Sequence, residues 1–308
     1  MILIISADDD TMTDAICAWL SFLNKKFVRL SENQLITAVV FDFKADVFKI
    51  DINGLRYDLK GFQSIFYRNG SLMYNGFKAE IDSHLKEFFN SELKSLTHFI
   101  YYYLEKSGAK IYGNIINREV NKLEVLHIAQ TLGFEIPDTY VISQLMDGSI
   151  LNASENYITK SISEVKPIFY ENDLYLNYTK EINLKYLNTK NENIIPSLIQ
   201  NRIDKIYEVR VFFFEKTIWA IATFEFSDDI DGRNIIEGAK KYLPLKLPKD
   251  INRKIRTLAK ILRLKCGTID MLKNEKDFYF LEINPLGQFH PVSHYGNYQI
   301  EKYIADLL

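Results

Sequence analysis

Three oxygen-bearing side chains near the C-terminal end of the sequence could converge on one point. Asp270 lies in the apolar stretch 267–271, and Glu282 and Asn284 lie in a second apolar stretch, 278–284, beyond a polar turn. The β-branched and aromatic residues of both stretches predict the two strands of a hairpin. Side chains two apart on a strand share a face, so Glu282 and Asn284 lie together and Asp270 on the partner strand can join them.

Two carboxylates and an amide oxygen are hard ligands that suit Mg²⁺, whose remaining positions are usually taken by water and substrate phosphates. The alternative is a pair of solvated acids on an edge hairpin. Two features favour the metal site. An acid inside an apolar strand is costly unless it is paired or bound to metal, and Pro285 ends the strand ladder directly after Asn284. The sequence therefore predicts a metal site formed by Asp270, Glu282 and Asn284.

The same residues carry a resemblance to a known family. The segment 269–271 (Ile-Asp-Met), followed by 280–285 (Phe-Leu-Glu-Ile-Asn-Pro), resembles the metal-binding signature of the ATP-grasp ligases. The appended segment 287–289 (Gly-Gln-Phe) resembles the branch that matures ribosomally made peptides, which includes the microviridin macrocycle ligases and the grasp-with-spasm maturases. The resemblance covers residues 117–290 well and the N-terminal third more weakly.

The resemblance implies an α/β chain with the ATP-grasp fold, in which ATP lies between two α+β subdomains. A pre-ATP-grasp α/β domain precedes them. The expected domains are an N-terminal domain at 1–117, a central subdomain at 118–196, and a C-terminal subdomain with the Mg²⁺ site at 197–308. The resemblance also implies a homodimer.

Five residues match nucleotide-binding positions of the family. Lys122 begins an expected helix, where the helix N-terminus favours anions, although taken alone it would be a surface lysine. Lys160 ends an apolar strand, so its stem is covered and its ammonium group needs an anion. Gln200 and Ile203 match the link whose backbone meets adenine, and Glu208 matches the acid that takes the ribose hydroxyls.

Three residues could act on the transferring phosphoryl group. Arg210 shares a strand face with Glu208 and either forms a salt bridge on the sheet or holds the phosphate or acyl phosphate, a task that suits a planar guanidinium. Asp231 and Arg233 match an Asp-x-Arg pattern of the family, in which the arginine stabilises charge beside the metal. A plain polar loop is the alternative for 227–233.

Further expectations concern the phosphate lid and the peptide. The family often has a glycine-bearing loop over the phosphates, but residues 161–165 contain no glycine, and their hydroxyl groups could serve instead. Arg68 follows a short strand, where it could approach a phosphate or a peptide carboxylate or simply lie in a turn. The family docks the leader segment of the precursor peptide on the central subdomain, which places leader contacts at 170–186.

The elements that must position these residues follow from hydrophobic periodicity. Apolar runs predict strands at 2–6, 36–43, 47–52, 64–67, 207–214 and 219–226. Amphipathic stretches predict helices at 80–106, 117–133 and 248–264, with Leu85, Phe88 and Ile261 facing the core. Thr11 or Thr13 is expected to cap an earlier helix, and the pair Asn53 and Gly54 predicts a hairpin turn.

The composition is that of a globular protein. The chain of 308 residues has 47% hydrophobic and 25% charged residues, and its net charge of −2 provides no basic field for nucleic acid. Two cysteines predict buried thiols in a reducing compartment rather than a disulfide framework. The sequence shows no secretory signal and no apolar run of the ~20 residues that a membrane helix needs, which predicts a cytoplasmic protein.

The resemblance implies a reaction. A carboxylate side chain of a precursor peptide attacks the γ-phosphate of ATP, and a Ser or Thr hydroxyl or a Lys amine of the same peptide captures the acyl phosphate. The products are a macrocyclic ester or amide, ADP and phosphate. One alternative keeps the fold but ligates free amino acids or extends a protein C-terminus. The other is a nucleotide-dependent peptide receptor without turnover, against which the set of Asp270, Glu282 and Asn284 argues.

Overall fold

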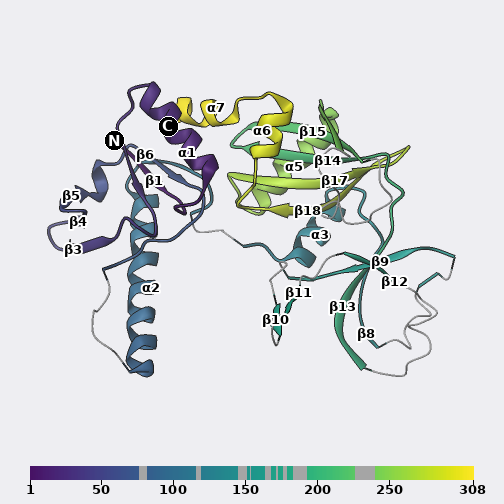
Figure 1. Cartoon of the computed structure of the whole chain (residues 1–308), viewed down its shortest axis with the longest axis horizontal. Coiled ribbons are helices and arrows are strands. Elements are labelled where there is room, and N and C mark those ends of the chain that lie inside the picture. The colour runs from purple at the N-terminus through teal and green to yellow at the C-terminus, as the bar shows by residue number, and fades with distance from the viewer. Residues whose placement is uncertain are drawn as a thin grey trace.

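The computed structural model describes residues 1–75, 82–115, 119–144, 151–152, 154–163, 168–170, 173–175, 179–182, 193–225 and 240–308. Among these residues, two four-stranded sheets and one five-stranded sheet form most of the structure, and sheets of two and three strands lie beside them (Figure 1). Helices pack between and around these sheets. The chain is therefore a mixed α/β protein, as the sequence predicts.

The N-terminal sheet is parallel, with the order β2 (Phe27–Leu30), β1 (Ile2–Ile5), β6 (Ser64–Tyr67) and β7 (Lys110–Tyr112). β1 is buried along its whole length, which confirms the strand expected from its apolar run. Helix α1 (Thr11–Phe22) connects β1 to β2 and has Asp10 at its N-cap position. Thr13 donates a hydrogen bond to the Asp10 carboxylate (2.7 Å). The prediction that Thr11 or Thr13 caps the helix is wrong, because Asp10 occupies that position.

A three-stranded antiparallel sheet lies beside the N-terminal sheet, and a single turn of 3₁₀ helix, Leu59–Gly61, follows it. Its strands are β3 (Ile36–Asp42), β4 (Val47–Ile52) and β5 (Leu55–Asp58). Asn53 and Gly54 join β4 to β5, and both have positive φ angles, 50° and 78°. Two residues in this conformation form the turn that Asn-Gly favours, so the predicted hairpin turn is confirmed.

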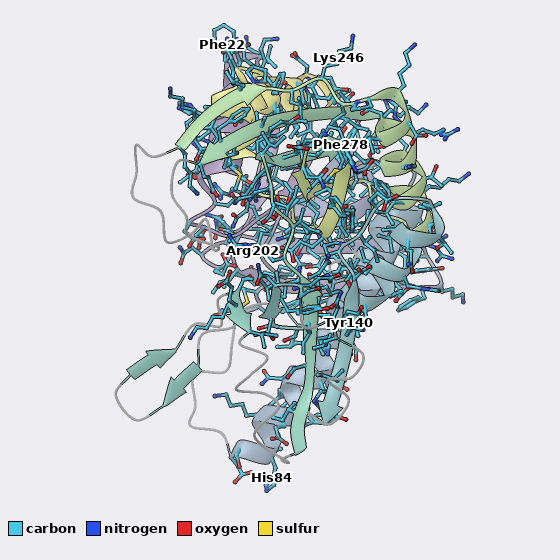
Figure 2. The ribbon with its side chains drawn as sticks, turned by 90° about the vertical axis from the view of Figure 1, so that its right-hand side faces the viewer. Phe22, His84, Tyr140, Arg202, Lys246 and Phe278 are labelled. Carbon is cyan, nitrogen blue, oxygen red and sulfur yellow. The ribbon has the colours of Figure 1, made fainter. Side chains whose placement is uncertain are left out.

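Helix α2 (Ser83–Lys106) is long, as predicted, but only its C-terminal half packs on the sheet. Leu104 is fully buried, whereas Leu85 and Phe88 are 52% and 57% exposed. The first half of the helix projects from the body, and His84 lies at its far end (Figures 1 and 2). The prediction that Leu85 and Phe88 face the core is wrong, because the apolar stripe is longer than the surface that covers it.

The central sheet is antiparallel, with the order β12 (Lys180–Ile182), β9 (Tyr157–Lys160), β13 (Asn193–Asn201) and β8 (Thr139–Gln144). A separate strand pair, β10 (Ile168–Tyr170) and β11 (Asp173–Tyr175), projects beside it (Figure 1). Within the described part of this region, the buried hydrophobic cluster consists of Ile142, Leu151, Tyr157 and Ile199. The described part of the central sheet therefore has a smaller hydrophobic cluster than the N-terminal and C-terminal sheets.

Helix α3 (Lys122–Thr131) leads into the central sheet. It is shorter than the predicted helix over 117–133, because Asn121 is the N-cap residue and its side chain accepts hydrogen bonds from two N–H groups of the first turn. Gly133, with a φ of 77°, follows the last turn, as expected for a residue that ends a helix.

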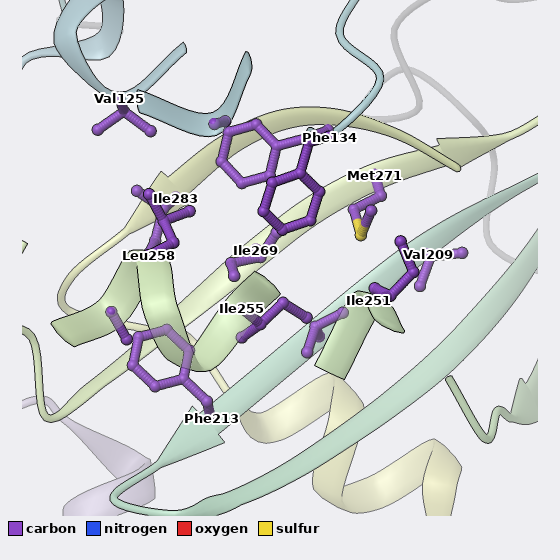
Figure 3. Packing of buried hydrophobic residues seen from close by; sticks show 14 of the residues in the cluster. Val125, Phe134, Val209, Phe213, Ile251, Ile255, Leu258, Ile269, Met271 and Ile283 are labelled. Atoms are coloured by element: carbon purple, nitrogen blue, oxygen red, sulfur yellow. The ribbon is translucent and has the colours of Figure 1, made fainter. Parts of the chain in front are cut away.

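The C-terminal sheet is antiparallel, with the order β16 (Lys240–Pro244), β15 (Thr217–Glu225), β14 (Tyr207–Phe214), β17 (Cys266–Lys273) and β18 (Phe278–Asn284). Helices α3 and α5 (Lys249–Ile261) cover one face. Their buried side chains form one hydrophobic cluster with those of β14, β17 and β18 (Figure 3). Ile261 is 50% exposed, so its predicted burial is wrong; α5 ends at this residue.

The opposite face of the C-terminal sheet carries a second cluster at one end. Phe212 and Phe214 of β14 pack with Ile4 of β1 and with two helices that the sequence analysis did not predict, α6 (His290–Gly296) and α7 (Ile300–Leu307). This cluster fastens the N-terminal sheet to the C-terminal sheet. At the other end of the same face the aromatic residues give way to charged ones, and the candidate site lies there.

Substitution of Gly113 tests how closely the backbone approaches itself at the ends of β6 and β7. Its φ is +89°, and a methyl group on its Cα would lie 1.9 Å from the Tyr67 carbonyl oxygen. Gly108 has a similar φ of +83° with open space around it. We expect Gly108→Ala to lower the free energy of unfolding by about 1 kcal/mol. We expect Gly113→Ala to lower it by at least about 3 kcal/mol, because a backbone carbonyl blocks the methyl group. Denaturant unfolding of both variants makes the comparison, and equal losses would contradict it.

Candidate functional site

Three charged side chains lie in a row across neighbouring strands of the C-terminal sheet. Arg210 of β14 pairs with Asp270 of β17, and Asp270 pairs with Glu282 of β18. Side chains directly opposite each other have Cβ atoms about 4.5–5.5 Å apart. Asn284 lies on the same face as Glu282, opposite Thr268. The predicted hairpin is present, and it brings Asp270, Glu282 and Asn284 to one face of the sheet.

A β-bulge decides which residues of β18 face the site. Asp270 pairs with Glu282, but the next residue, Met271, pairs with Phe280, so Leu281 is an extra residue in β18. In a regular strand Phe280 and Glu282 would share a face. The bulge separates them, so that Phe280 is fully buried in the core while Glu282 faces the site.

Glu282 adds to the cost of ionising Asp270. The pKa of Asp270 is raised to about 6, first because surrounding protein atoms desolvate its carboxylate and then because Glu282 and Glu208 lie nearby. The positive charges of Arg210 and Lys160 oppose this rise in the pKa. Asp270 is therefore harder to ionise than an ordinary aspartate, and a bound divalent cation would favour its ionised form.

Two lysines from other elements reach the acid pair. Lys122, at the start of α3, places its Nζ 3.3 Å from Oε2 of Glu282 and donates a hydrogen bond to the Ser161 carbonyl oxygen (3.1 Å). Burial lowers the pKa of Lys160, at the end of β9; Glu282 and Asp270 oppose this shift, and Lys122 adds to it. The two lysines singled out from the sequence therefore belong to one charged cluster with the predicted metal ligands.

The backbone at the start of α3 contributes less than the sequence suggests. The side-chain oxygen of Asn121 accepts hydrogen bonds from the N–H groups of Leu123 and Glu124 (2.9 and 3.2 Å). Because these donors are occupied, the ammonium group of Lys122 is the main source of positive charge at this helix end.

Arg210 is the cation of the row and has unused donors. Its Nη1 lies 3.8 Å from Oδ1 of Asp270, and its Nη2 lies 3.5 Å from the Gln288 carbonyl oxygen, both long contacts. Its Nε is buried and has no hydrogen-bond partner among the described residues. A buried donor without a partner is costly, and an oxyanion would satisfy it. The weak salt bridge therefore leaves Arg210 able to bind a phosphoryl oxygen.

The donor set fits Mg²⁺. A divalent cation would offset the repulsion between Asp270 and Glu282, and carboxylate and amide oxygens are suitable ligands. The Asn284 Oδ1 accepts one hydrogen bond, from the Leu286 N–H (3.0 Å), which orients the amide and leaves a second lone pair. The described residues contain no group of three or more His, Cys, Asp or Glu side chains suited to a metal. The site therefore depends on the amide oxygen and on substrate phosphates to complete the ligand set.

Gln200 and Ile203 have different surroundings. Gln200 lies in β13 between Thr139 of β8 and Ile158 of β9, and its side chain donates a hydrogen bond to the Thr139 hydroxyl (2.9 Å). Gln200 therefore lies within a strand rather than in the loop that follows it, and its side-chain Oε1 is buried without a hydrogen-bond partner among the described residues. Its contact with the nucleotide stays a prediction. Ile203 lies between β13 and β14, and its contact with adenine stays a prediction.

Glu208 belongs to a charge network that the sequence analysis missed. The Lys205 Nζ lies 2.5 Å from a carboxylate oxygen of Glu208 and 2.5 Å from one of Glu225. The side chain of Glu225 is 2% exposed, and the Lys240 Nζ lies 3.2 Å from it. Strand alternation could have placed Glu225 near Glu208 only if the register of β14 and β15 had been known. The contact of Glu208 with ribose stays a prediction.

Several expectations fall on residues outside the described ranges. Asp231 and Arg233 lie in 226–239, and only 161–163 of the glycine-free loop are described. The structure describes the backbone of part of the expected leader-contact region, 170–186, but few of its side chains. The roles of all these residues stay predictions.

Arg68 is engaged by protein groups rather than open to a ligand. Its side chain is 7% exposed, its Nε lies 3.4 Å from the Asp10 carboxylate, and its Nη1 donates a hydrogen bond to the Leu286 carbonyl oxygen. These contacts favour the alternative in which Arg68 belongs to the turn rather than to the binding of a phosphate or a peptide carboxylate. The strand end is instead packed against the turn that follows β18.

The cysteines do not form a second reactive site. Both are free; Cys266 is buried and Cys17 is partly buried. Burial raises the pKa of Cys17 to about 11 and that of Cys266 to about 12, so neither supplies a thiolate at neutral pH.

Two surface hollows of about 610 and 400 Å³ have linings that do not include the row of Arg210, Asp270 and Glu282. Their linings include Lys216 and Arg256 in the first and Trp219 in the second. The charged cluster, rather than a cavity, identifies the candidate site. Across the described residues, no helix has both the length and the apolar character that crossing a membrane requires.

Comparison of the sequence with known family models and with curated proteins gives no match. Comparison of the structure gives matches over the whole chain. A RiPP-associated ATP-grasp ligase from Chryseobacterium gregarium, in complex with ADP and a leader and core peptide, matches with a TM-score of 0.79 and 23% identity, covering 100% of this chain and 96% of its own.

Two further structures are similar. The macrocyclase MdnC from Microcystis aeruginosa, bound to the precursor peptide MdnA, has a TM-score of 0.77 and 22% identity, with 100% and 99% of the two chains covered. The ATP-grasp ligase PsnB, complexed with a minimal precursor, Mg and ADP, has a TM-score of 0.73 and 15% identity, with 99% and 96% covered. This chain has the ATP-grasp fold over its whole length, which confirms the fold that the metal-binding signature implies.

Asp270→Asn tests the electrostatics of the acid row. Because the pKa is raised to about 6, the folded protein binds a proton here more tightly than the unfolded chain does. The resulting stabilisation is present at low pH and is lost as the pH rises through 6. Asparagine keeps the shape and removes the charge. In metal-free protein we expect this variant to raise the free energy of unfolding by on the order of 1 kcal/mol at neutral pH and very little in acid, allowing for partial solvent screening.

Chemical denaturation in EDTA at the two pH values measures this difference. Asp277→Asn, an exposed position in the turn of the same hairpin, is the control and should change stability little at either pH. A gain from Asp270→Asn that does not depend on pH would contradict the raised pKa.

Proposed function

We propose that this protein is an ADP-forming ATP-grasp ligase. It activates Asp or Glu side chains of a ribosomally made precursor peptide and joins them to Ser or Thr hydroxyls or Lys amines of the same peptide. The observation that carries the proposal is the convergence of two lysines, an arginine and the acids Asp270 and Glu282 on one face of an ATP-grasp sheet. The whole-length similarity to ligases that hold ADP and precursor peptides supports a peptide substrate.

The cations of the cluster form the phosphate-binding part of the proposed site. Lys122 and Lys160, on α3 and β9, would hold the phosphates of ATP as point charges. Arg210, whose buried Nε has no partner among the described residues, would hold the transferring phosphoryl group and then the acyl phosphate. Each of these cations is near a carboxylate in the structure, and phosphate oxygens would take over these contacts when ATP binds.

Asp270, Glu282 and Asn284 would hold Mg²⁺. When bound, Mg²⁺ supplies positive charge that offsets the charge of the phosphates and of the transferring group. Both carboxylates must be ionised to act as ligands, so we expect metal binding to weaken as the pH falls below the raised pKa of Asp270, about 6.

The reaction requires no covalent enzyme nucleophile. A carboxylate oxygen of the peptide attacks the γ-phosphorus of ATP, the bond to the β-phosphate oxygen breaks, and ADP leaves. A hydroxyl or amine of the same peptide then attacks the acyl carbon, loses its proton, and phosphate leaves. The peptide loses one water for each ring. The enzyme contributes positioning and stabilisation of negative charge.

Four further residue assignments belong to the proposal. Asp231 and Arg233 would act on the phosphoryl group beside the metal. Ile203 would lie against adenine, and Glu208 would bind the ribose hydroxyls after exchanging its contact with Lys205. Gln200, which pairs within β13, stays a candidate for the same adenine link.

The proposal also includes the organisation of the chain. An N-terminal domain at 1–117 precedes a central subdomain and a C-terminal subdomain, with the boundary near 201 rather than 196 because β13 belongs to the central sheet. The precursor leader would dock around 170–186. We propose a homodimer in the cytoplasm.

Incubation with ATP, Mg²⁺ and candidate peptides tests the reaction. The peptides are those encoded beside the gene that contain Ser or Thr together with Asp or Glu. We expect ADP release and a peptide that has lost the mass of one water per ring, read by mass spectrometry. Joining of two molecules would indicate ligation of free substrates instead, and ATP binding without ADP release would indicate a receptor.

Lys160→Met tests the phosphate-binding role. Methionine keeps the apolar stem and removes the ammonium group, so we expect a folded protein whose rate of ADP formation falls about 100-fold or more. Lys302→Met is the control, because Lys302 is on the surface and paired with Asp306 (2.8 Å). Comparable rates for the two variants would exclude a role for Lys160 in ATP turnover.

A further inference from the structure

The turn that follows β18 is held tightly from within. Asn284 accepts two hydrogen bonds, one at its side-chain oxygen from the Leu286 N–H (3.0 Å) and one at its carbonyl oxygen from the Gly287 N–H (3.1 Å). Gly287 has a φ of +57° and packs on Gly267, where a methyl group would lie 3.0 Å from the carbonyl carbon. The orientation of the Asn284 side chain is therefore coupled to the path of the turn.

Asn114, which follows β7 in the N-terminal sheet, fastens this turn to the start of β17. Its Nδ2 donates hydrogen bonds to the carbonyl oxygens of Pro285 (2.7 Å) and Cys266 (2.8 Å), and its Oδ1 accepts one from the Lys265 N–H (2.8 Å). Asn114 is 5% exposed, and both its amide N–H groups are used. One side chain thus holds together the two ends of the hairpin that carries the predicted metal ligands.

Arg68, which follows β6, holds the next carbonyl group of the same turn. Its Nη1 donates a hydrogen bond to the Leu286 carbonyl oxygen, its Nε faces the Asp10 carboxylate at 3.4 Å, and its guanidinium lies 5.3 Å from the centre of the Phe289 ring. The Asp10 carboxylate offsets the cost of burying this guanidinium charge. The N-terminal sheet therefore supplies donors to two consecutive carbonyl groups, those of Pro285 and Leu286.

From these contacts we propose that Asn114 and Arg68 are positioning residues for the metal site, which they serve by fixing the turn that orients the Asn284 amide oxygen. The inference rests on the proposed function, because it assumes that Asn284 is a Mg²⁺ ligand. It assigns the N-terminal sheet a part in metal binding although none of its side chains lies among the ligands. Outer partners that orient a ligand typically change metal affinity by about 10- to 100-fold when removed.

The binding of Mn²⁺ in the presence of ADP tests the proposal on the full-length protein. Electron paramagnetic resonance measures the bound and free Mn²⁺. We expect Asn114→Ala to weaken Mn²⁺ binding about 10- to 100-fold. We expect the affinity for ADP measured in EDTA to stay unchanged, because the lysines do not depend on this turn. Asn252→Ala is the matched control; this asparagine also donates to two carbonyl oxygens, those of Leu247 and Pro248 (3.1 and 3.3 Å), but in helix α5.

Arg68→Lys provides a second variant in case Asn114→Ala does not fold. Lysine keeps a positive charge for Asp10 but cannot reach both partners with one planar group. We expect weaker Mn²⁺ binding with unchanged metal-free ADP binding here too. Normal Mn²⁺ affinity in either folded variant would overturn the positioning role while leaving the ligase proposal intact. Failure of the wild-type protein to bind Mn²⁺ with ADP would overturn the metal site itself and the inference with it.

Discussion

The pairing of two like charges across adjacent strands is the constraint on which the candidate site depends. Asp270 and Glu282 lie directly opposite each other, an arrangement that destabilises a sheet unless positive charge is near. Arg210 on one side and Lys122 on the other provide that charge within the protein. The same arrangement gives the site its capacity for a divalent cation and a polyanion. A cation that binds the two acids would displace Arg210 and Lys122, and these two side chains could then contact the polyanion.

The two faces of the C-terminal sheet explain how such a row can exist in a stable protein. One face is covered by α3 and α5 and buries Val209, Ile269 and Ile283. On the other face, aromatic residues of β14 pack against the N-terminal sheet, and the charged residues begin where that packing ends. The strands are therefore anchored on both sides close to the charged row, and the acids are held by a rigid support rather than by a loop.

Much of the fold could be predicted because the relevant signals are local. The apolar run of β1, the Asn-Gly turn at 53–54 and the strands of the acid hairpin follow from side-chain type and periodicity, and each is present. The wrong predictions concern features that tertiary contacts determine, namely which apolar side chains are buried and which segments pair as strands. The first turns of α2 carry an apolar stripe that nothing among the described residues buries, and strand pairing, which sequence does not reveal, places Gln200 inside the central sheet.

The candidate site shows the same division. The acids and lysines could be chosen by residue type within recognisable segments. The bulge at Leu281 and the contacts of Asn114 could not, because each depends on register or on residues far apart in the sequence. A single asparagine after a short strand carries no local signal of a distant role. The irregular spacing of Phe280, Glu282 and Ile283 is a weak signal of the bulge, since strict alternation cannot bury both apolar residues and expose the acid.

Buried side chains are distributed unevenly over the described residues on the two sides of the site. In the described part of the central sheet, the hydrophobic cluster has four buried residues, whereas the cluster beneath Asp270 and Glu282 spans two helices and several strands. Segments with few buried contacts open at lower free energy and exchange their amide hydrogens faster. Lys160 lies on the sheet with the smaller described cluster, and a nucleotide that bridges Lys160 and the acids would stabilise the arrangement in which the two sheets are held together.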